Sequence, residues 1–225
     1  MSGFSKSFKK LVNPQFILAN KLSEDGKALA QSLVASLMMA QGQFCTSPGI
    51  WAYVSDENSA TFEKSAVQAI SETAAGVMLT PGIAKSYNNT VEQWQSMTGV
   101  ECLAQGNTPN TEQAHFCSAA LFATDLATFK VNEALHEEVF GSSALIVRCQ
   151  NQVEFMEFIS LLKGNLTASI HASEKDLYVA QQVALAAVHK VGRLIYNQMP
   201  TGVEVCASMN HGGPFPASTQ IRTTS

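Results

Sequence analysis

The chain has 225 residues, of which 46% are hydrophobic and 14% are charged, and its formal net charge is -4. This composition is typical of a globular protein, and the length allows one large domain or two small ones. The negative charge argues against a protein that binds the phosphate backbone of nucleic acids. We also expect no membrane span and no signal peptide, because no apolar run is long enough for either.

In chain order, the hydrophobic pattern predicts alternating strands and helices after a loose polar lead-in over residues 1–12. The expected strands are 14–19, 50–54, 100–103, 119–123, 144–149, 166–171 and 193–196. The expected helices are 24–40, 59–75, 86–97, 152–162 and 174–191, with Ser23 and Ser173 as N-caps of the first and the last. This alternation favours an α/β fold with a largely parallel sheet.

Cys45 lies in the segment Gly42–Gly49, between the first long helix and the strand over 50–54. Glycine and proline bound this segment, so we expect a loop that is held by rigid elements and carries a thiol at an exposed connection. Reactive groups often occupy such positions. The alternative is that Cys45 is a small, partly buried apolar residue, as most free cysteines are.

The chain has five cysteines, and no two of them form a C-x-x-C pair. The odd count favours reduced thiols in a cytoplasmic protein, and the spacing predicts no metal site. The other four lie in or near apolar runs, so we expect them to be packing residues: Cys102, Cys117, Cys149 and Cys206.

Four further short segments follow the Cys45 loop along the chain: 137–141 (EEVFG), 164–169 (GNLTAS), 192–197 (GRLIYN) and 211–216 (HGGPFP). Together with Gly42–Cys45 they resemble the catalytic domain of the aldehyde dehydrogenase superfamily, over nearly all of the chain from Asn13. Residues 79–83, 200–205 and 211–217 are similar to one branch, the α-ketoglutaric semialdehyde (2,5-dioxopentanoate) dehydrogenases, and they are equally similar to the NADP-preferring fatty aldehyde dehydrogenases.

The resemblance implies that Cys45 is the nucleophile that forms a thiohemiacetal with a small-molecule aldehyde and then a thioester. It implies that the backbone N–H of Cys45 is half of an oxyanion hole. Glu138 matches the carboxylate that binds the ribose of NAD or NADP, and Phe140 matches the aromatic residue beside the nicotinamide. From the residues alone, Glu138 would be a solvated carboxylate and Phe140 a core residue. The resemblance also implies a homo-oligomer.

The chain departs from the family in ways that bear on activity. Family members carry a cofactor-binding domain before this region, but here no glycine-rich phosphate loop is found. Phe8 stands where the family has a general-base glutamate, and phenylalanine accepts no proton. We therefore expect residues 13–225 to be a catalytic domain that lacks its cofactor-binding domain and C-terminal segment. Alone, it should be inactive and bind no cofactor.

Two other hypotheses stay open. In the first, the chain is a stand-alone, non-catalytic binding or assembly module derived from such an enzyme. In the second, weaker one, Cys45 hydrolyses esters, which requires no hydride acceptor.

Overall fold

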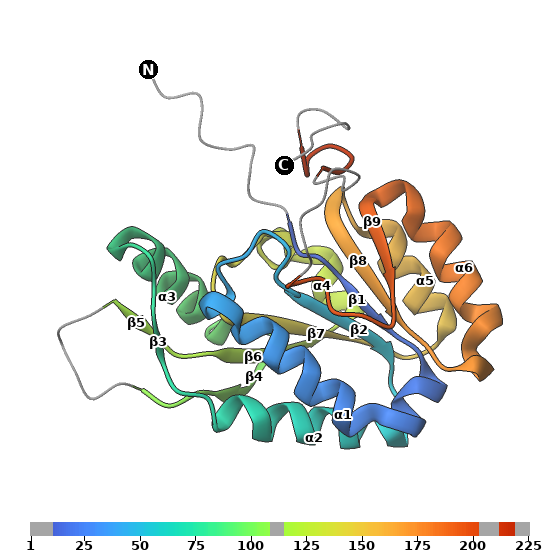
Figure 1. Cartoon of the computed structure of the whole chain (residues 1–225), viewed down its shortest axis with the longest axis horizontal. Helices are drawn as coiled ribbons and strands as arrows, with labels where there is room; N and C mark the ends of the chain where they lie inside the picture. Colours follow the sequence, from blue (N-terminus) through green and yellow to red (C-terminus); the bar gives the residue numbers. More distant parts are fainter. Residues whose placement is uncertain (1–10, 109–114, 203–211, 219–225) are drawn as a thin grey trace.

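The structure is a computed structural model that describes residues 11–108, 115–202 and 212–218. Its centre is a seven-stranded sheet in the order β4-β6-β7-β2-β1-β8-β9 (Figure 1). Neighbouring strands run parallel except at the edge, where β4 is antiparallel to β6. The bounds are β1 Gln15–Ile17, β2 Ile50–Val54, β4 Val100–Gln105, β6 Ala120–Asp125, β7 Ser143–Cys149, β8 Asn165–His171 and β9 Val191–Tyr196. The predicted α/β fold with a largely parallel sheet is confirmed. Two short strands, β3 Gly76–Val77 and β5 Phe116–Cys117, pair separately.

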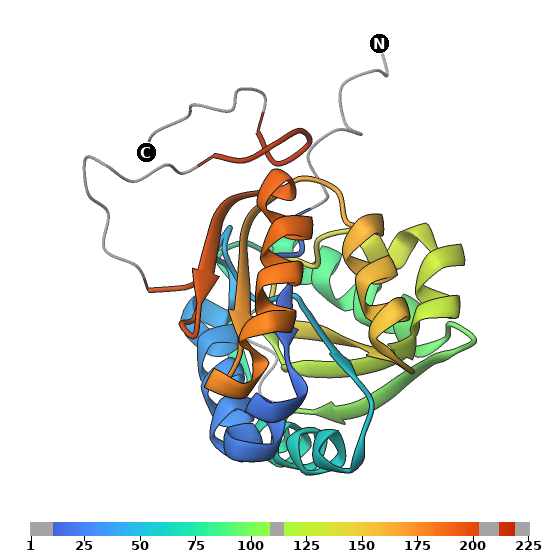
Figure 2. The same ribbon diagram turned by 90° about the vertical axis from the view of Figure 1, so that its right-hand side faces the viewer.

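Helices cover both faces of the sheet (Figures 1 and 2). One face carries α1 Ala19–Met38 and α2 Glu57–Ser71. The other carries α3 Pro81–Gln95, α4 Leu126–Val131, α5 Gln152–Leu161 and α6 Leu177–Ala187. Short 3₁₀ turns lie at Met39–Gly42 (η1), Glu133–His136 (η2), Glu174–Asp176 (η3) and Val188–Lys190 (η4).

The sequence of strand β2 is apolar throughout and does not alternate between apolar and polar residues, because helices cover both of its faces. Side chains of a strand point to opposite faces in turn. Ile50 and Ala52 pack in the core on the α5 and α6 side, whereas Trp51 and Tyr53 pack beneath α1 and α2. Because both faces are covered, every position favours an apolar residue. The predicted bounds of this strand are confirmed.

The start of α1 differs from the prediction, because a distant carboxylate caps it. The helix begins before the expected Glu24, and Ser23 lies inside it. The side chain of Asp176 accepts hydrogen bonds from the backbone N–H groups of Asn20 and Lys21, at 3.1 and 2.9 Å. This pairing links residues 156 positions apart, so local pattern does not reveal it.

Three other helices differ from the prediction. Ser173 is an N-cap, as expected, but the helix expected over 174–191 is divided into η3, α6 and η4. Helix α2 starts after an Asp56 cap and ends well before Gly76, which lies in β3. The short helix α4 was not predicted; its cap is Asp125, which accepts a bond from the N–H of Thr128 at 2.7 Å.

Candidate functional site

Cys45 lies in a turn just before β2, at the edge where the parallel strands begin. The N–H of Ser47 donates to the carbonyl of Phe44 at 3.0 Å, and this bond closes the turn around Cys45. Cys45 itself is half-buried. The expected loop between a helix and a strand is therefore present, and its thiol is fixed against the start of the sheet.

Asn13 ties this turn to strand β8 of the sheet. Its Nδ2 donates to the carbonyl oxygens of Cys45 and Ser47 at 2.8 and 3.1 Å. Its Oδ1 accepts from the backbone N–H of Thr167, in β8, at 3.2 Å. Asn13 is 1% exposed and has a φ of 41°, a left-handed conformation that asparagine tolerates better than most residues.

Val12 extends this connection. It is buried, its carbonyl accepts from the N–H groups of Gly49 and Ile50 at 3.1 Å each, and its own N–H donates to Asn165 Oδ1 at 2.8 Å. A residue expected in the loose lead-in is thus part of the core. Residues 1–10, which include Phe8, lie outside the described residues.

A close backbone contact joins the Cys45 loop to the segment that follows Glu138. A Cβ atom at Gly42 would lie 2.2 Å from the carbonyl oxygen of Gly141, closer than any real contact, and Gly42 has a φ of +66°. Only glycine fits both conditions. The first two segments singled out in the sequence are therefore adjacent in space.

The remaining segments meet at the same edge of the sheet. A Cβ at Gly164 would lie 2.0 Å from the carbonyl oxygen of Pro214, and a Cβ at Gly192 would lie 1.6 Å from that of Gly212. The segment at 212–218 therefore packs directly against the starts of β8 and β9. Asn165 also accepts a hydrogen bond beside Asn13, and Arg193 is within electrostatic reach of Cys45, so the described segments 137–141, 164–169, 192–197 and 212–216 gather around the Cys45 turn. Residues 203–211, which include parts of two further segments, lie outside the described chain.

Burial and the carboxylate of Glu138 raise the pKa of the Cys45 thiol above its usual value. The guanidinium of Arg193 and the backbone N–H groups of Cys45 and Thr46 act in the opposite direction, but the net shift is upward. Since the thiolate is the nucleophilic form, the surroundings described here keep Cys45 largely as a thiol at neutral pH.

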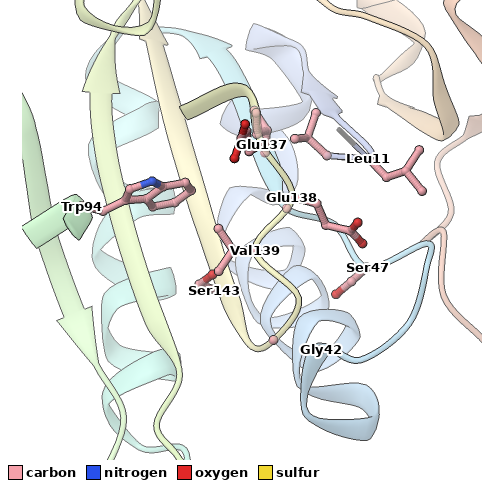
Figure 3. A pocket seen from close by; sticks show the side chains of 12 residues that line it. Leu11, Gly42, Ser47, Trp94, Glu137, Glu138, Val139 and Ser143 are labelled. Carbon is pink, nitrogen blue, oxygen red and sulfur yellow. The ribbon is translucent and has the colours of Figure 1, made fainter. Parts of the chain in front are cut away.

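Glu138 lies between two hollows and its carboxyl points toward Ser47, whereas Glu137 points away (Figure 3). Burial raises the pKa of Glu138 to about 7. The smaller hollow, of about 20 Å³, is large enough for about one water molecule. Three of its polar atoms are buried without a hydrogen-bond partner in the described chain: Ser47 Oγ, Trp94 Nε1 and Ser143 Oγ.

Phe140 lies on the larger hollow, of about 180 Å³, between α3 and residues 134–140. Phe140 is 36% exposed, so the alternative that it is a core residue does not describe it. Ligand pockets usually start near 300 Å³, so this hollow is too small for a whole dinucleotide. Glu138 and Phe140 are adjacent to it, which is compatible with their expected roles.

The other chemistry-bearing residues were predicted unevenly. Cys117 and Cys149 are buried, as expected, but Cys102 is exposed on edge strand β4, so the packing prediction was wrong for it. Cys206 lies outside the described residues. Arg193, in β9, was not selected from the sequence, where its place in the 192–197 segment was the only signal.

Within residues 11–108, 115–202 and 212–218, no three His, Cys, Asp or Glu side chains form a metal site, and no helix is long and apolar enough to cross a membrane.

Comparison with known proteins identifies the family of the chain and shows which solved structures share its fold. The chain is 38% identical to α-ketoglutaric semialdehyde dehydrogenase 2 of Azospirillum brasilense and 34% identical to α-ketoglutaric semialdehyde dehydrogenase of Acinetobacter baylyi. Each match covers 95% of this chain and 40% of the relative, so the chain spans about two fifths of the length of these curated relatives.

Solved structures of low sequence identity share the fold. Succinic semialdehyde dehydrogenase of Streptococcus pyogenes, whose structure holds NADP⁺, superposes with a TM-score of 0.71 at 19% identity, over 90% of this chain and 44% of that one. The model of the aldehyde dehydrogenase family matches residues 13–216. The chain therefore belongs to the aldehyde dehydrogenase family.

Proposed function

We propose that this chain contributes the catalytic cysteine of an NAD(P)-dependent aldehyde dehydrogenase, which oxidises an aldehyde to a carboxylic acid. The observation that carries the proposal is the placement of Cys45. It lies in a turn fixed by Asn13, at the edge of the sheet where the family-like segments converge, with Glu138 and Arg193 within electrostatic reach of its thiol.

In the proposed reaction, Cys45 Sγ attacks the aldehyde carbon, a C–S bond forms and the thiol proton passes to water. In this proposal, the backbone N–H of Cys45 donates to the oxygen of the resulting thiohemiacetal. When bound, NAD or NADP supplies the acceptor for the hydride that leaves this carbon. The acyl group then remains on Cys45 as a thioester, and its hydrolysis releases the acid and restores the thiol.

Two residues are proposed to hold the cofactor. Glu138 would bind the ribose and Phe140 would lie beside the nicotinamide, since both border the larger hollow next to the Cys45 turn. The curated relatives act on α-ketoglutaric semialdehyde by their names, so we propose a semialdehyde or fatty aldehyde as substrate.

The first test asks whether Cys45 adds to an aldehyde. The chain is mixed with an aldehyde that carries ¹³C at its carbonyl, and the NMR signal of a thiohemiacetal carbon is sought above pH 9, where more thiolate is present. We expect the signal in the wild type and not in Cys45→Ser. No Cys45-dependent signal at any pH would reject the proposal.

The second test concerns turnover. We expect no reduced nicotinamide when the chain alone receives aldehyde with NAD or NADP, and no measurable binding of either cofactor. Steady turnover that Cys45→Ser abolishes would contradict this expectation and strengthen the enzymatic assignment.

One observation favours the alternative of a non-catalytic binding or assembly module, namely the raised pKa of Cys45. A protonated thiol is a poor nucleophile. Failure of the ¹³C test, with the chain folded, would support this alternative.

Self-association is proposed as well. Tyr178 and Leu185, both on α6, are each 74% exposed, and exposed apolar surface promotes contacts between copies. Sedimentation at several concentrations checks this, and a strictly monomeric profile would contradict it.

A further inference from the structure

Arg193 carries a buried donor that nothing in the described chain satisfies. Its Nη2 atom is shielded from solvent and has no hydrogen-bond partner among the described residues. The other arginine described, Arg148, is fully engaged: it donates from Nε and Nη2 to Glu63, at 2.7 Å each, and from Nη1 to Glu101 at 3.0 Å. Leaving a charged donor buried without an acceptor is unfavourable, so Nη2 of Arg193 can gain from a hydrogen bond to an anionic group.

The backbone places Arg193 close to Cys45. Arg193 in β9 lies directly opposite Thr167 in β8. Thr167 donates from its N–H to Asn13 Oδ1 at 3.2 Å, and Asn13 donates to the carbonyl of Cys45 at 2.8 Å. One strand pair and two hydrogen bonds therefore connect the two residues. The guanidinium also lowers the pKa of the Cys45 thiol, so its charge reaches the sulfur.

We propose that Arg193 binds a carboxylate on the molecule that reacts with Cys45, so that the site selects aldehydes that are also carboxylic acids. A guanidinium is suited to a carboxylate, because its planar set of donors matches the two oxygens. The inference rests on the proposed function and refines it, since it favours a semialdehyde acid over an uncharged fatty aldehyde.

Glu138 supports the same orientation of the substrate. Its carboxyl lies on the Ser47 side of the site and affects the Cys45 thiol with the opposite sign from Arg193 (Figure 3). When Glu138 is ionised, it repels the carboxylate of the substrate. An anionic substrate should therefore place its charged end next to Arg193 and away from Glu138.

The test compares two alkylating agents of similar size, iodoacetate with a carboxylate and iodoacetamide without one. The rate of each is measured at Cys45 by peptide mass spectrometry. Their ratio is the readout, because a change in the thiolate fraction of Cys45 alters both rates equally and cancels. Cys102 is an internal reference, since it is exposed on β4 and reports the intrinsic ratio of the two reagents.

In the wild type, we expect the iodoacetate-to-iodoacetamide ratio at Cys45 to exceed the ratio at Cys102 by about threefold or more at low salt. Arg193→Gln should lower it to the Cys102 value, and Arg193→Lys should keep most of it. Lys27→Gln removes the same charge from an exposed site on α1 and should change nothing. Equal ratios at Cys45 and Cys102 in the wild type would overturn the proposal.

A second measurement needs no variant. Glutarate, which carries two carboxylates, should slow the alkylation of Cys45 by iodoacetamide in the wild type and leave Cys102 unaffected, and added salt should weaken this protection. Absence of protection, together with equal ratios, rejects the role of Arg193.

The outcomes separate this inference from the proposed function. A ¹³C adduct of uncharged propanal with Cys45, combined with equal reagent ratios, rejects only the role of Arg193. A clear iodoacetate preference without an adduct from any aldehyde rejects only the dehydrogenase reaction.

Discussion

Asn13 donates a hydrogen bond from its Nδ2 to the carbonyl oxygen of Cys45 at 2.8 Å, across 32 residues of sequence. The same amide group donates to Ser47, and its oxygen accepts from Thr167. One buried side chain therefore sets the position of the whole turn relative to β8. The position of the candidate nucleophile therefore depends on Asn13, a residue that takes no part in the proposed reaction.

We expect Asn13→Ala to lower the free energy of unfolding by about 2–4 kcal/mol, because it leaves buried carbonyl groups without a donor. Asn13→Gly removes the same hydrogen bonds but adopts a positive φ readily, so it should be about 1 kcal/mol more stable than the alanine variant. Urea unfolding measures both values. A change below 1 kcal/mol in each variant would show that the turn is held by other contacts.

Gly42 provides a test of the contact between the Cys45 loop and the segment after Glu138. Gly42→Ala places a Cβ 2.2 Å from the carbonyl oxygen of Gly141 at a φ of +66°, so we expect a loss of about 2–4 kcal/mol. The loop must also shift, so alkylation of Cys45 by iodoacetamide should change in rate.

The matched control is Gly82→Ala. Gly82 lies in the first turn of α3, and a Cβ there would approach Thr80 Oγ1 only to 3.8 Å. We expect this variant to be equal to or slightly more stable than the wild type, because alanine has the higher helix propensity. Equal stabilities of the two alanine variants would contradict the close contact at Gly42.

Much of the fold could be predicted because the sheet is covered on both sides, so its strands are short continuous apolar runs such as Ile50–Val54. Details that depend on distant partners could not be predicted. The cap of α1 comes from Asp176, and the turn of Cys45 is held by Asn13. At the site, Cys45 was selected through the resemblance of several segments rather than from its loop alone, and Arg193 was not selected, because the importance of a strand arginine depends on which neighbours fail to neutralise it.

His171 should make the protein less stable in acid. It is buried, and its Nε2 is 3.0 Å from Gln15 Oε1. Burial, and secondarily the charge of Lys21, lower its pKa to about 4, whereas the unfolded chain has the ordinary value near 6.5. The unfolded state then binds more protons between these values, so this stability is present above pH 6.5 and is lost as the pH falls through 4.

The expected loss is about 3 kcal/mol, and His171→Gln should remove it from the pH profile of urea unfolding. His189→Gln, at an exposed position in η4, is the control and should keep the wild-type loss. If His171→Gln shows the same acid-side loss as the wild type, His171 is not its source.

Glu138 should have the opposite effect from His171 and make the protein less stable as the pH rises. Burial raises its pKa from 4.5 to about 7, so the folded state binds more protons than the unfolded state between these values. The contribution of Glu138 to stability is therefore present below pH 4.5 and is lost as the pH rises through 7. Because the side chain is only partly buried, we expect this loss to be about 1–2 kcal/mol after solvent screening.

The measurement is the difference in the free energy of unfolding between pH 5 and pH 8 for wild type, Glu138→Gln and Glu137→Gln. The glutamine at 138 cannot ionise, so this variant should become more stable than the wild type at pH 8 and lose that advantage at pH 5. Glu137 is exposed and points away from Glu138 in the pocket view (Figure 3), so its variant should follow the wild type. Since His171 titrates in part of the same range, only the difference between the two neighbouring variants isolates Glu138. Identical pH profiles for them would mean that the carboxyl of Glu138 is solvated, and its proposed place beside a cofactor ribose would lose its physical basis.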